Sequence, residues 1–407
     1  MVTPVDYTTA PTNFENIPEQ EGDWRTEITA MMVQLQERRK AVQNSEILRG
    51  VHPKSHGCLD AEFSVNTCLD SRFKIGLFAE PGRSFKAKIR YSNADVLKRA
   101  DLEVDEDESG NKVFKHGSRG MAIKVLDVDG PVYMEDGGAK NQDFLMINTP
   151  EFAFRNVRDY RRLTQVLLAS ADAADPELFF LPLKLLELGV LDPSGNLLPP
   201  QPSEPEIVKK LRLLFTSSDL FKDFSADDMR GALSSFAIVQ KIQAKAVRDP
   251  IDARYFSAAP FRFGPDRVMR VSVEPVGGEQ PVPPFSDAEL AALDADYLSK
   301  ALADRMACTE AIKLSFKIQI ADAAQLEGKI DDMIENAAMA WDENDHPFTE
   351  VAQLTIHPPE QDVELVDRCK PLLFTPWHAL NAHEPLGGIN RLRKPVYSTS
   401  ATFRRTT

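Results

Sequence analysis

The stretch Phe85-Lys-Ala-Lys-Ile-Arg-Tyr91 places apolar and charged side chains at alternate positions. A period of two puts the apolar set on one face, which predicts a β-strand that is buried on one side. The same alternation recurs on both sides of this stretch, at residues 61–65 and 121–125. Two later stretches, 268–276 and 314–320, predict further strands. Because these strands are scattered among helical segments, we expect an α+β fold: an antiparallel β-barrel with helical insertions.

Helical periodicity is the next pattern outward from the strands. Residues 23–43 carry apolar side chains at helical spacing, and residues 157–172 and 206–248 also favour helices. A Pro- and Leu-rich insertion, residues 175–205, lies between the last two segments, and its residues 192–205 are typical of a loop. This insertion could form an apolar channel wall or a lid, and the sequence leaves both roles open.

The composition sets limits on size and partners. The chain has 407 residues, of which 43% are hydrophobic, and the formal net charge of −14 argues against nucleic acid as a partner. The longest apolar candidate, Leu178–Val190, contains Pro182 and two charged residues, so we expect no membrane span. Since no repeat or linker divides the chain, we expect an N-terminal arm and helix at 1–48 and a main domain at 49–407.

The cysteines and the N-terminus bear on the cellular compartment. Residues 1–13 are polar and carry no apolar signal core, so we expect a cytoplasmic protein. The four cysteines, at positions 58, 68, 308 and 369, show no CxxC pair and no metal-type spacing. We therefore expect four free thiols in a reducing compartment.

Three segments carry polar residues that suit catalysis or ligand binding: Arg49-Gly-Val51-His52, Asn148-Thr-Pro150-Glu-Phe152, and Arg393-Lys-Pro-Val-Tyr397 followed by Arg404. Each one alone has an ordinary explanation. A lone histidine is usually structural, Asn-Thr-Pro usually forms a turn, and Arg and Tyr four residues apart usually share an exposed helical face. No zinc or calcium motif accompanies them.

Together, and in this order, these segments resemble the haem catalases. The resemblance rests on six matches: Arg49-x-x-His52, Arg90-Tyr-Ser92, Arg119-Gly-Met-Ala-Ile-Lys124, Asn148-Thr-Pro150 with Phe152, Pro260-Phe-Arg-Phe-Gly264, and Arg393-x-x-x-Tyr397 with Arg404. It covers residues 49–405 and is closest to the short catalase-like haem proteins that lack the family's extra C-terminal domain. It implies that residues 49–407 form a catalase-like domain that binds haem b.

The resemblance also implies how the haem would be held. Tyr397 would ligate the iron as a phenolate, on a proximal helix that we expect to begin near Asn390 because it contains Pro395. Arg393, one helical turn from Tyr397, would stabilise that anion. The remaining cofactor contacts are three arginines for the propionates and three residues around the haem face and rim: Arg49, Arg90, Arg404, Val51, Phe152 and Tyr160.

On the opposite side of the haem the resemblance places His52 and Ser92. A neutral His52 would take a proton from a bound peroxide and return it to the outer oxygen, which is general acid–base catalysis. Ser92 would hydrogen-bond the other ring nitrogen, and Val51 would narrow the approach. The nearby His56 has no counterpart in the family, and we expect it to lie in a loop.

One position departs from the family pattern. Catalases carry two consecutive asparagines before Thr-Pro, and the first helps to orient peroxide, whereas this chain has Ile147 there. An aliphatic side chain cannot donate a hydrogen bond. We therefore expect weak dismutation of hydrogen peroxide beside peroxidase activity with organic hydroperoxides.

Three functional hypotheses follow from the resemblance. The first is a haem-dependent hydroperoxidase, a peroxidase or weak catalase that reduces hydrogen peroxide or organic hydroperoxides. The second is a lipid hydroperoxide isomerase or lyase similar to allene oxide synthase, although those enzymes typically have threonine where this chain has Val51. The third is a non-enzymatic haem binder, which would not need the pair of His52 and Ser92. The sequence leaves open the physiological substrate, the electron donor and whether the chain forms a homo-oligomer.

Overall fold

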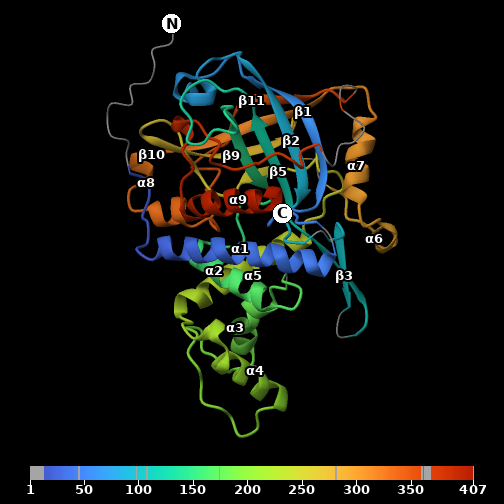
Figure 1. Cartoon of the computed structure of the whole chain (residues 1–407), viewed down its shortest axis with the longest axis vertical. Helices are drawn as coiled ribbons and strands as arrows, with labels where there is room; N and C mark the ends of the chain where they lie inside the picture. The colour runs from blue at the N-terminus through green and yellow to red at the C-terminus, as the bar shows by residue number, and fades with distance from the viewer. Residues whose placement is uncertain are drawn as a thin grey trace.

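An eight-stranded antiparallel barrel forms the centre of the molecule (Figure 1). The computed structural model describes residues 13–44, 46–97, 99–106, 109–173, 175–279, 282–358, 361 and 368–406, so residues 1–12 of the expected arm lie outside it. The barrel strands, in hydrogen-bonded order, are β10 (Ile312–Asp322), β11 (Thr349–Ile356), β1 (Ser55–Val65), β2 (Ser84–Asn93), β5 (Arg119–Val125), β6 (Gln142–Ile147), β7 (Tyr255–Ser257) and β9 (Arg267–Pro275). Pairing of β10 with β9 closes the barrel.

Two smaller strand pairings flank the barrel. The short strand β8 (Phe261–Arg262) pairs with β9, and β3 (Leu102–Glu106) pairs with β4 (Lys112–His116) in a separate hairpin. The α+β barrel that the alternating stretches predicted is confirmed.

Most of the helices lie on one side of the barrel (Figure 1). The helices are α1 (Glu21–Gln43), α2 (Val157–Ala169), α3 (Glu177–Glu187), α4 (Glu206–Ser217), α5 (Ala226–Ala244), α6 (Asp287–Ala292), α7 (Tyr297–Met306), α8 (Ala323–Leu326) and α9 (Gly388–Thr406). Shorter helical turns lie at Ser71–Phe73, Gly76–Phe78, Asp219–Phe221, Asp331–Glu335 and Asn381–His383. Helix α1 packs between α9 and α2, while α3, α4 and α5 extend away from the barrel. Within the described residues, no helix is long and apolar enough to cross a bilayer.

The helical region after β6 is more divided than the sequence predicted. The stretch expected to be helical from 206 to 248 contains two helices, because Ser218 and Ser225 each cap a new helical turn. Ser225 forms a capping box with Asp228, which satisfies free amide groups at the start of α5. The insertion at 175–205 is part helix, α3, and part loop.

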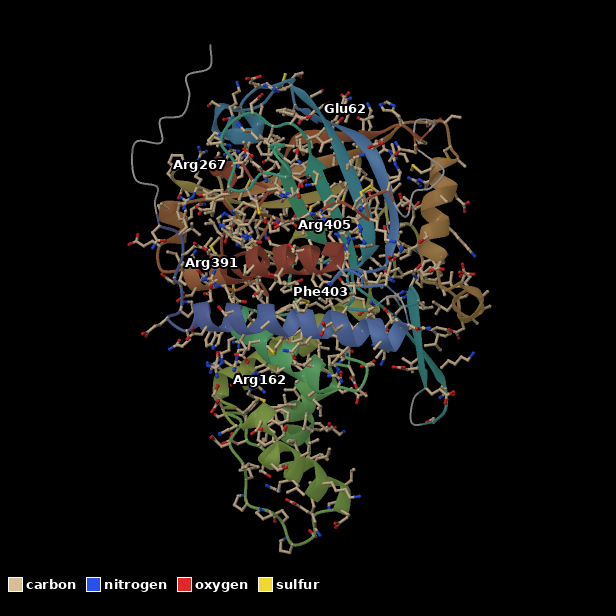
Figure 2. The ribbon with its side chains drawn as sticks, in the orientation of Figure 1. Glu62, Arg162, Arg267, Arg391, Phe403 and Arg405 are labelled. Atoms are coloured by element: carbon tan, nitrogen blue, oxygen red, sulfur yellow. A yellow bond between two sulfur atoms is a disulfide. The ribbon has the colours of Figure 1, made fainter. Side chains whose placement is uncertain are left out.

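The two faces of the barrel strands have different roles. Ile89 and Tyr91 of β2 point into the main core, where aromatic rings such as those of Phe144 and Phe316 meet at 5.0 Å. The intervening residues Arg90 and Ser92 must therefore point to the outer face. Helix α9 lies along this outer face. Figure 2 labels Arg391 near one end of this helix and Arg405 near the other.

A disulfide crosses from the barrel to the segment that precedes α9. Cys58 of β1 is bonded to Cys369, 311 residues later, with their Cα atoms 5.6 Å apart. The expectation of four free thiols is therefore wrong for these two residues, whereas Cys68 and Cys308 are free and exposed. The spacing of the cysteines in the sequence could not reveal this pair. The two residues meet only because the barrel closes and the segment before α9 comes to lie beside β1.

Candidate active site

A cavity lies between the outer face of the barrel and α9. Four chain segments and the barrel strands line it, with the residues Met32, Arg49, Gly50, Val51, His52, Arg90, Ser92, Met121, Ala122, Leu145, Met146, Ile147, Leu373, Phe374, Arg393, Val396, Tyr397, Ser400, Ala401 and Arg404. Eight of the ten predicted site residues are among them; the exceptions are Phe152 and Tyr160.

One stripe of α9 forms a whole wall of this cavity. Six of its residues line the cavity, at relative positions 0, 3, 4, 7, 8 and 11: Arg393, Val396, Tyr397, Ser400, Ala401 and Arg404. Residues at these spacings share one face of an α-helix, so all six side chains point to the same side of α9. The helix begins at Gly388, two residues before the expected start, and continues through Pro395.

Tyr397 and Arg393 both face the cavity. The Tyr397 hydroxyl has no hydrogen-bond partner within the described residues, which leaves its oxygen free for a ligand. Arg393 donates from Nη1 to Asn390 Oδ1 at 3.3 Å, and its guanidinium lies 5.8 Å from the centre of the Phe152 ring. Its charge is thus on the cavity side of α9, one turn before Tyr397.

His52 lies on the barrel side of the cavity in a constrained backbone conformation. Its φ of 55° is in the left-handed region that non-glycine residues rarely adopt. Two hydrogen bonds hold the backbone there: the His52 amide donates to Asp95 O at 2.9 Å, and Arg90 Nη2 donates to His52 O at 2.8 Å. Ser92 Oγ lies 3.1 Å from Nδ1, so Nε2 is the ring nitrogen that stays free. Local strain of this kind is typical of functional positions.

Gly120 makes room for this imidazole, and the sequence argument assigned it no role. It lies opposite Ser92 in the pairing of β5 with β2. A Cβ atom at this position would lie 2.5 Å from His52 Nδ1 and 2.9 Å from Ser92 Oγ. The glycine of the Arg119-Gly-Met-Ala match therefore serves the site directly, and only the register of β5 against β2 shows this role.

Burial and neighbouring arginines keep His52 neutral. Loss of solvent lowers the pKa of His52 to about 3, and the positive charges of Arg90, Arg393 and Arg49 lower it in the same direction. At neutral pH the imidazole is therefore unprotonated and can accept a proton.

Arg49, Arg90 and Arg404 concentrate positive charge at one end of the cavity. None of the three forms an ion pair with a carboxylate in the part of the chain that the structure describes. Burial, and after it the charge of Arg404, lowers the pKa of Arg90 to about 10. The pKa of Arg49 is also lowered, by burial and then by Arg90 and Arg404. Arg404 Nη2 is buried and has no hydrogen-bond partner among the described residues. An anion bound here would relieve this repulsion.

Phe152 and Tyr160 line a second, adjoining cavity instead of the first. Their rings are stacked, with centroids 6.4 Å apart and an interplanar angle of 15°. The two cavities share Ile147 among other residues, whereas Asn148 lines neither of them. Asn148 Oδ1 instead accepts a hydrogen bond from the backbone amide of Arg119 at 2.7 Å. The Asn148 side chain therefore holds the backbone of β5.

His56 is not the loop residue that the sequence predicted. It belongs to β1, is only 1% exposed, and its Nε2 lies 2.9 Å from Asn93 Oδ1. Burial lowers its pKa to about 4. His56 lines neither cavity, so it is a neutral core histidine within a buried polar network.

Solved structures of catalases are similar to this fold. A fungal catalase matches with 15% identity and a TM-score of 0.56, over 89% of this chain and 60% of that chain. Catalase A from Saccharomyces cerevisiae matches with 14% identity and a TM-score of 0.59, over 89% and 62%. A bacterial catalase matches with 14% identity and a TM-score of 0.55, over 89% and 58%.

These similarities show a catalase-like fold, as the order of motifs predicted. The chain spans about three fifths of the length of these catalases. Neither a protein-family model nor a curated protein sequence matches the chain.

Proposed function

We propose that this chain, which has a catalase-like fold, is a haem-dependent peroxidase or weak catalase that reduces hydrogen peroxide or organic hydroperoxides. One observation carries the proposal: Tyr397 on α9 and the pair of His52 and Ser92 on the barrel line the same cavity. An unpartnered phenol on one wall and a neutral imidazole on another are the two groups that a Tyr-ligated haem peroxidase needs.

The residues around the first cavity fit a haem. Arg49, Arg90 and Arg404 form a buried cationic cluster that suits two propionates, and the unpartnered Arg404 Nη2 is a donor ready for one of them. Apolar side chains of α9 and the barrel, such as Val396 and Leu145, suit the faces of the ring. Tyr397 would be the iron ligand, and bound haem would supply the redox chemistry at the oxygen–oxygen bond.

His52 would handle the proton in this reaction. Its neutral Nε2 takes the proton from the inner oxygen of the hydroperoxide and delivers it to the outer oxygen, which leaves as an alcohol or as water. Ser92 holds Nδ1, and the two backbone hydrogen bonds of His52 fix the backbone from which the ring extends. Overall, one hydroperoxide takes up two electrons and two protons and yields an alcohol and water, with an organic reductant such as a phenol as the electron source.

Ile147 favours peroxidase over catalase activity. Dismutation requires a second hydrogen peroxide held in the pocket by hydrogen bonds, and Ile147 offers no donor. Asn148 does not replace it, because its side chain lines neither cavity. Loss of one such donor typically lowers a rate by about 10²–10³.

The test begins with haem binding by the purified chain. We expect a Soret band with the features of a high-spin ferric phenolate complex, and Tyr397→Phe should lose or loosen the haem. Tyr160→Phe is the matched control, because Tyr160 lines only the second cavity. Unchanged haem content and spectrum in Tyr397→Phe would contradict the proposed ligand.

Activity forms the second part of the test. The haem form should oxidise a phenolic donor with an organic hydroperoxide, and His52→Ala should slow the reaction with hydroperoxide by roughly 100-fold or more. His56→Ala serves as the comparison because His56 lies outside both cavities. Equal stopped-flow rates for wild type and His52→Ala would remove His52 from the mechanism.

A further inference from the structure

A second cavity of about 340 Å³ adjoins the first beyond His52. The two cavities share six lining residues: Val51, His52, Ile147, Arg393, Val396 and Tyr397. Since His52 and Tyr397 belong to both, the second cavity leads directly to the place where the hydroperoxide would react. A water molecule takes up about 30 Å³ in the liquid, so hydrogen peroxide alone needs very little of this space.

The walls of the second cavity are largely apolar and come from the helical region. Six apolar residues of this region line it: Phe152, Phe154, Leu163, Phe180, Val239 and Ile242. The last four belong to α2, α3 and α5, the helices that lie beneath α1 in Figure 1. The Phe154 ring meets the Phe179 ring of α3 at 5.5 Å, which joins this wall to a packed apolar cluster. Such walls stabilise hydrocarbon and offer little to a small polar molecule.

One residue of the cavity wall also contacts an apolar side chain that is exposed at the protein surface. The Phe180 ring lies 5.8 Å from the ring of Phe236, which is 45% exposed on α5. One turn along α5, Val239 lines the cavity. Polar groups lie on another part of the wall, which includes Asp95, Asp101, Glu103 of β3, Lys115 and His116 of β4, and Arg119 of β5. Lys115 is paired with Asp105, and His116 Nδ1 is buried without a partner among the described residues. The lining is thus amphipathic, with most of its helical side apolar.

We propose that the second cavity binds the hydrocarbon chain of a long-chain alkyl or acyl hydroperoxide and so places the hydroperoxide group beside His52. This inference rests on the proposed function and specifies the substrate class of that site. The residues that select the substrate are those of the apolar helical wall, above all Val239 and Ile242 of α5, which are remote in sequence from the catalytic groups. Each methylene group that the cavity buries tightens binding by about four-fold.

Binding of redox-inert ligands tests the cavity without catalysis. The holoprotein is titrated by calorimetry with straight-chain primary alcohols from butanol to dodecanol. We expect the dissociation constant to fall by about four-fold for each added methylene until the cavity is full. Val239→Glu should abolish this dependence, because it places a charge on the cavity wall. Ala237→Glu is the matched control, since Ala237 is exposed on the same helix and does not line the cavity.

A milder substitution at the same position provides a test that does not depend on whether Val239→Glu folds. Val239→Phe keeps the wall apolar and fills part of the cavity, so it should shorten the longest alcohol that still gains affinity. A dissociation constant that does not change with chain length in the wild-type protein would overturn the inference. Equal effects of the substitutions at positions 237 and 239 would overturn it as well.

Kinetics separate this inference from the proposed function. For the wild-type holoprotein, kcat/KM should rise from hydrogen peroxide through ethyl to dodecyl hydroperoxide, and Val239→Glu should remove the rise. Alcohol binding that depends on chain length, without turnover of any hydroperoxide, would support the cavity and defeat the proposed function. Turnover that is equal for all chain lengths would defeat the inference and leave the proposed function standing.

Discussion

At the scale of single residues, the site depends on how His52 is held. Three features position its ring: a left-handed backbone, the Ser92 hydroxyl at Nδ1, and a neighbouring strand without a side chain at Gly120. The first two concern groups that the sequence argument named, whereas the third is visible only in the register of β2 and β5.

Gly120→Ala should therefore damage catalysis and spare haem binding. The added Cβ would lie 2.5 Å from His52 Nδ1, so the imidazole or the strand must move. We expect the reaction with hydroperoxide, followed by stopped-flow absorbance, to slow by roughly 100-fold, the usual scale of general acid–base catalysis. Gly22→Ala is the control, because a Cβ there meets nothing within 4 Å. A Gly120→Ala protein that reacts at the wild-type rate would show that the ring position does not matter.

Ile147→Asn should raise the dismutation of hydrogen peroxide. An amide at this position, which faces both cavities, restores a hydrogen-bond donor beside His52. One positioned donor is worth about 10²–10³ in rate, and oxygen evolution at an electrode measures the gain. Ile147→Leu keeps the position apolar and should behave like the wild type. Fast dismutation by the wild-type protein, near the diffusion limit, would mean that another group already supplies the donor.

At the scale of elements, α9 and the segment before it build the cationic end of the first cavity together. Cys58 lies opposite Arg90 in the pairing of β1 with β2, and the disulfide joins it to Cys369. The carbonyl of Cys369 in turn accepts from Arg49 Nη2 at 2.7 Å, and that of Leu372 accepts at 2.8 Å. The disulfide thus connects the supports of two arginines that would hold the haem propionates.

Removal of this disulfide should weaken both the fold and haem retention. For the double variant Cys58→Ser with Cys369→Ser, we expect the free energy of unfolding in urea to fall by about 2–4 kcal/mol. Haem transfer to an excess of apomyoglobin should also be faster, because Arg49 loses its fixed carbonyl partners. Cys68→Ser, at an exposed free cysteine, provides the control. Identical unfolding curves and haem transfer rates for the double variant and this control would refute the coupling.

At the scale of the whole molecule, buried neutral histidines limit stability in acid. His383 is fully buried before α9, and its Nε2 accepts from the Leu77 amide at 3.0 Å. Burial lowers the pKa of His383 to about 4, and that of His56 also to about 4. The unfolded chain binds these protons near pH 6.5, whereas the folded chain excludes them until about pH 4.

His383→Gln should therefore flatten the pH dependence of stability. Because the unfolded state binds more protons between pH 6.5 and 4, the free energy of unfolding falls as the pH drops through this window. We expect a loss of about 2 kcal/mol between pH 7 and pH 5 from His383 alone. Glutamine keeps an acceptor for the Leu77 amide and removes the titration, so urea unfolding curves of the variant should lose that contribution. His357→Gln, at an exposed histidine, should change nothing, and a similar slope in both variants would contradict the assignment to His383.

The sequence by itself determined the features that depend on local periodicity and order. Alternation predicted the strands that became β1, β2, β5, β9 and β10, and the resemblance to the haem catalases implied the helix that carries Arg393 and Tyr397. The order of the motifs was enough to predict a catalase-like fold. Such patterns are local, because a strand or a helix aims its side chains within a few residues.

Only the tertiary structure decided which of these faces meet and what lies between them. The disulfide spans 311 residues, His56 lies in a buried strand, and the size of the second cavity depends on how α2, α3 and α5 pack. None of these follows from a local pattern, because each depends on contacts made when the barrel closes and the helices pack against it. The role of Gly120 belongs with them, since an absent side chain matters only for the imidazole that occupies its place.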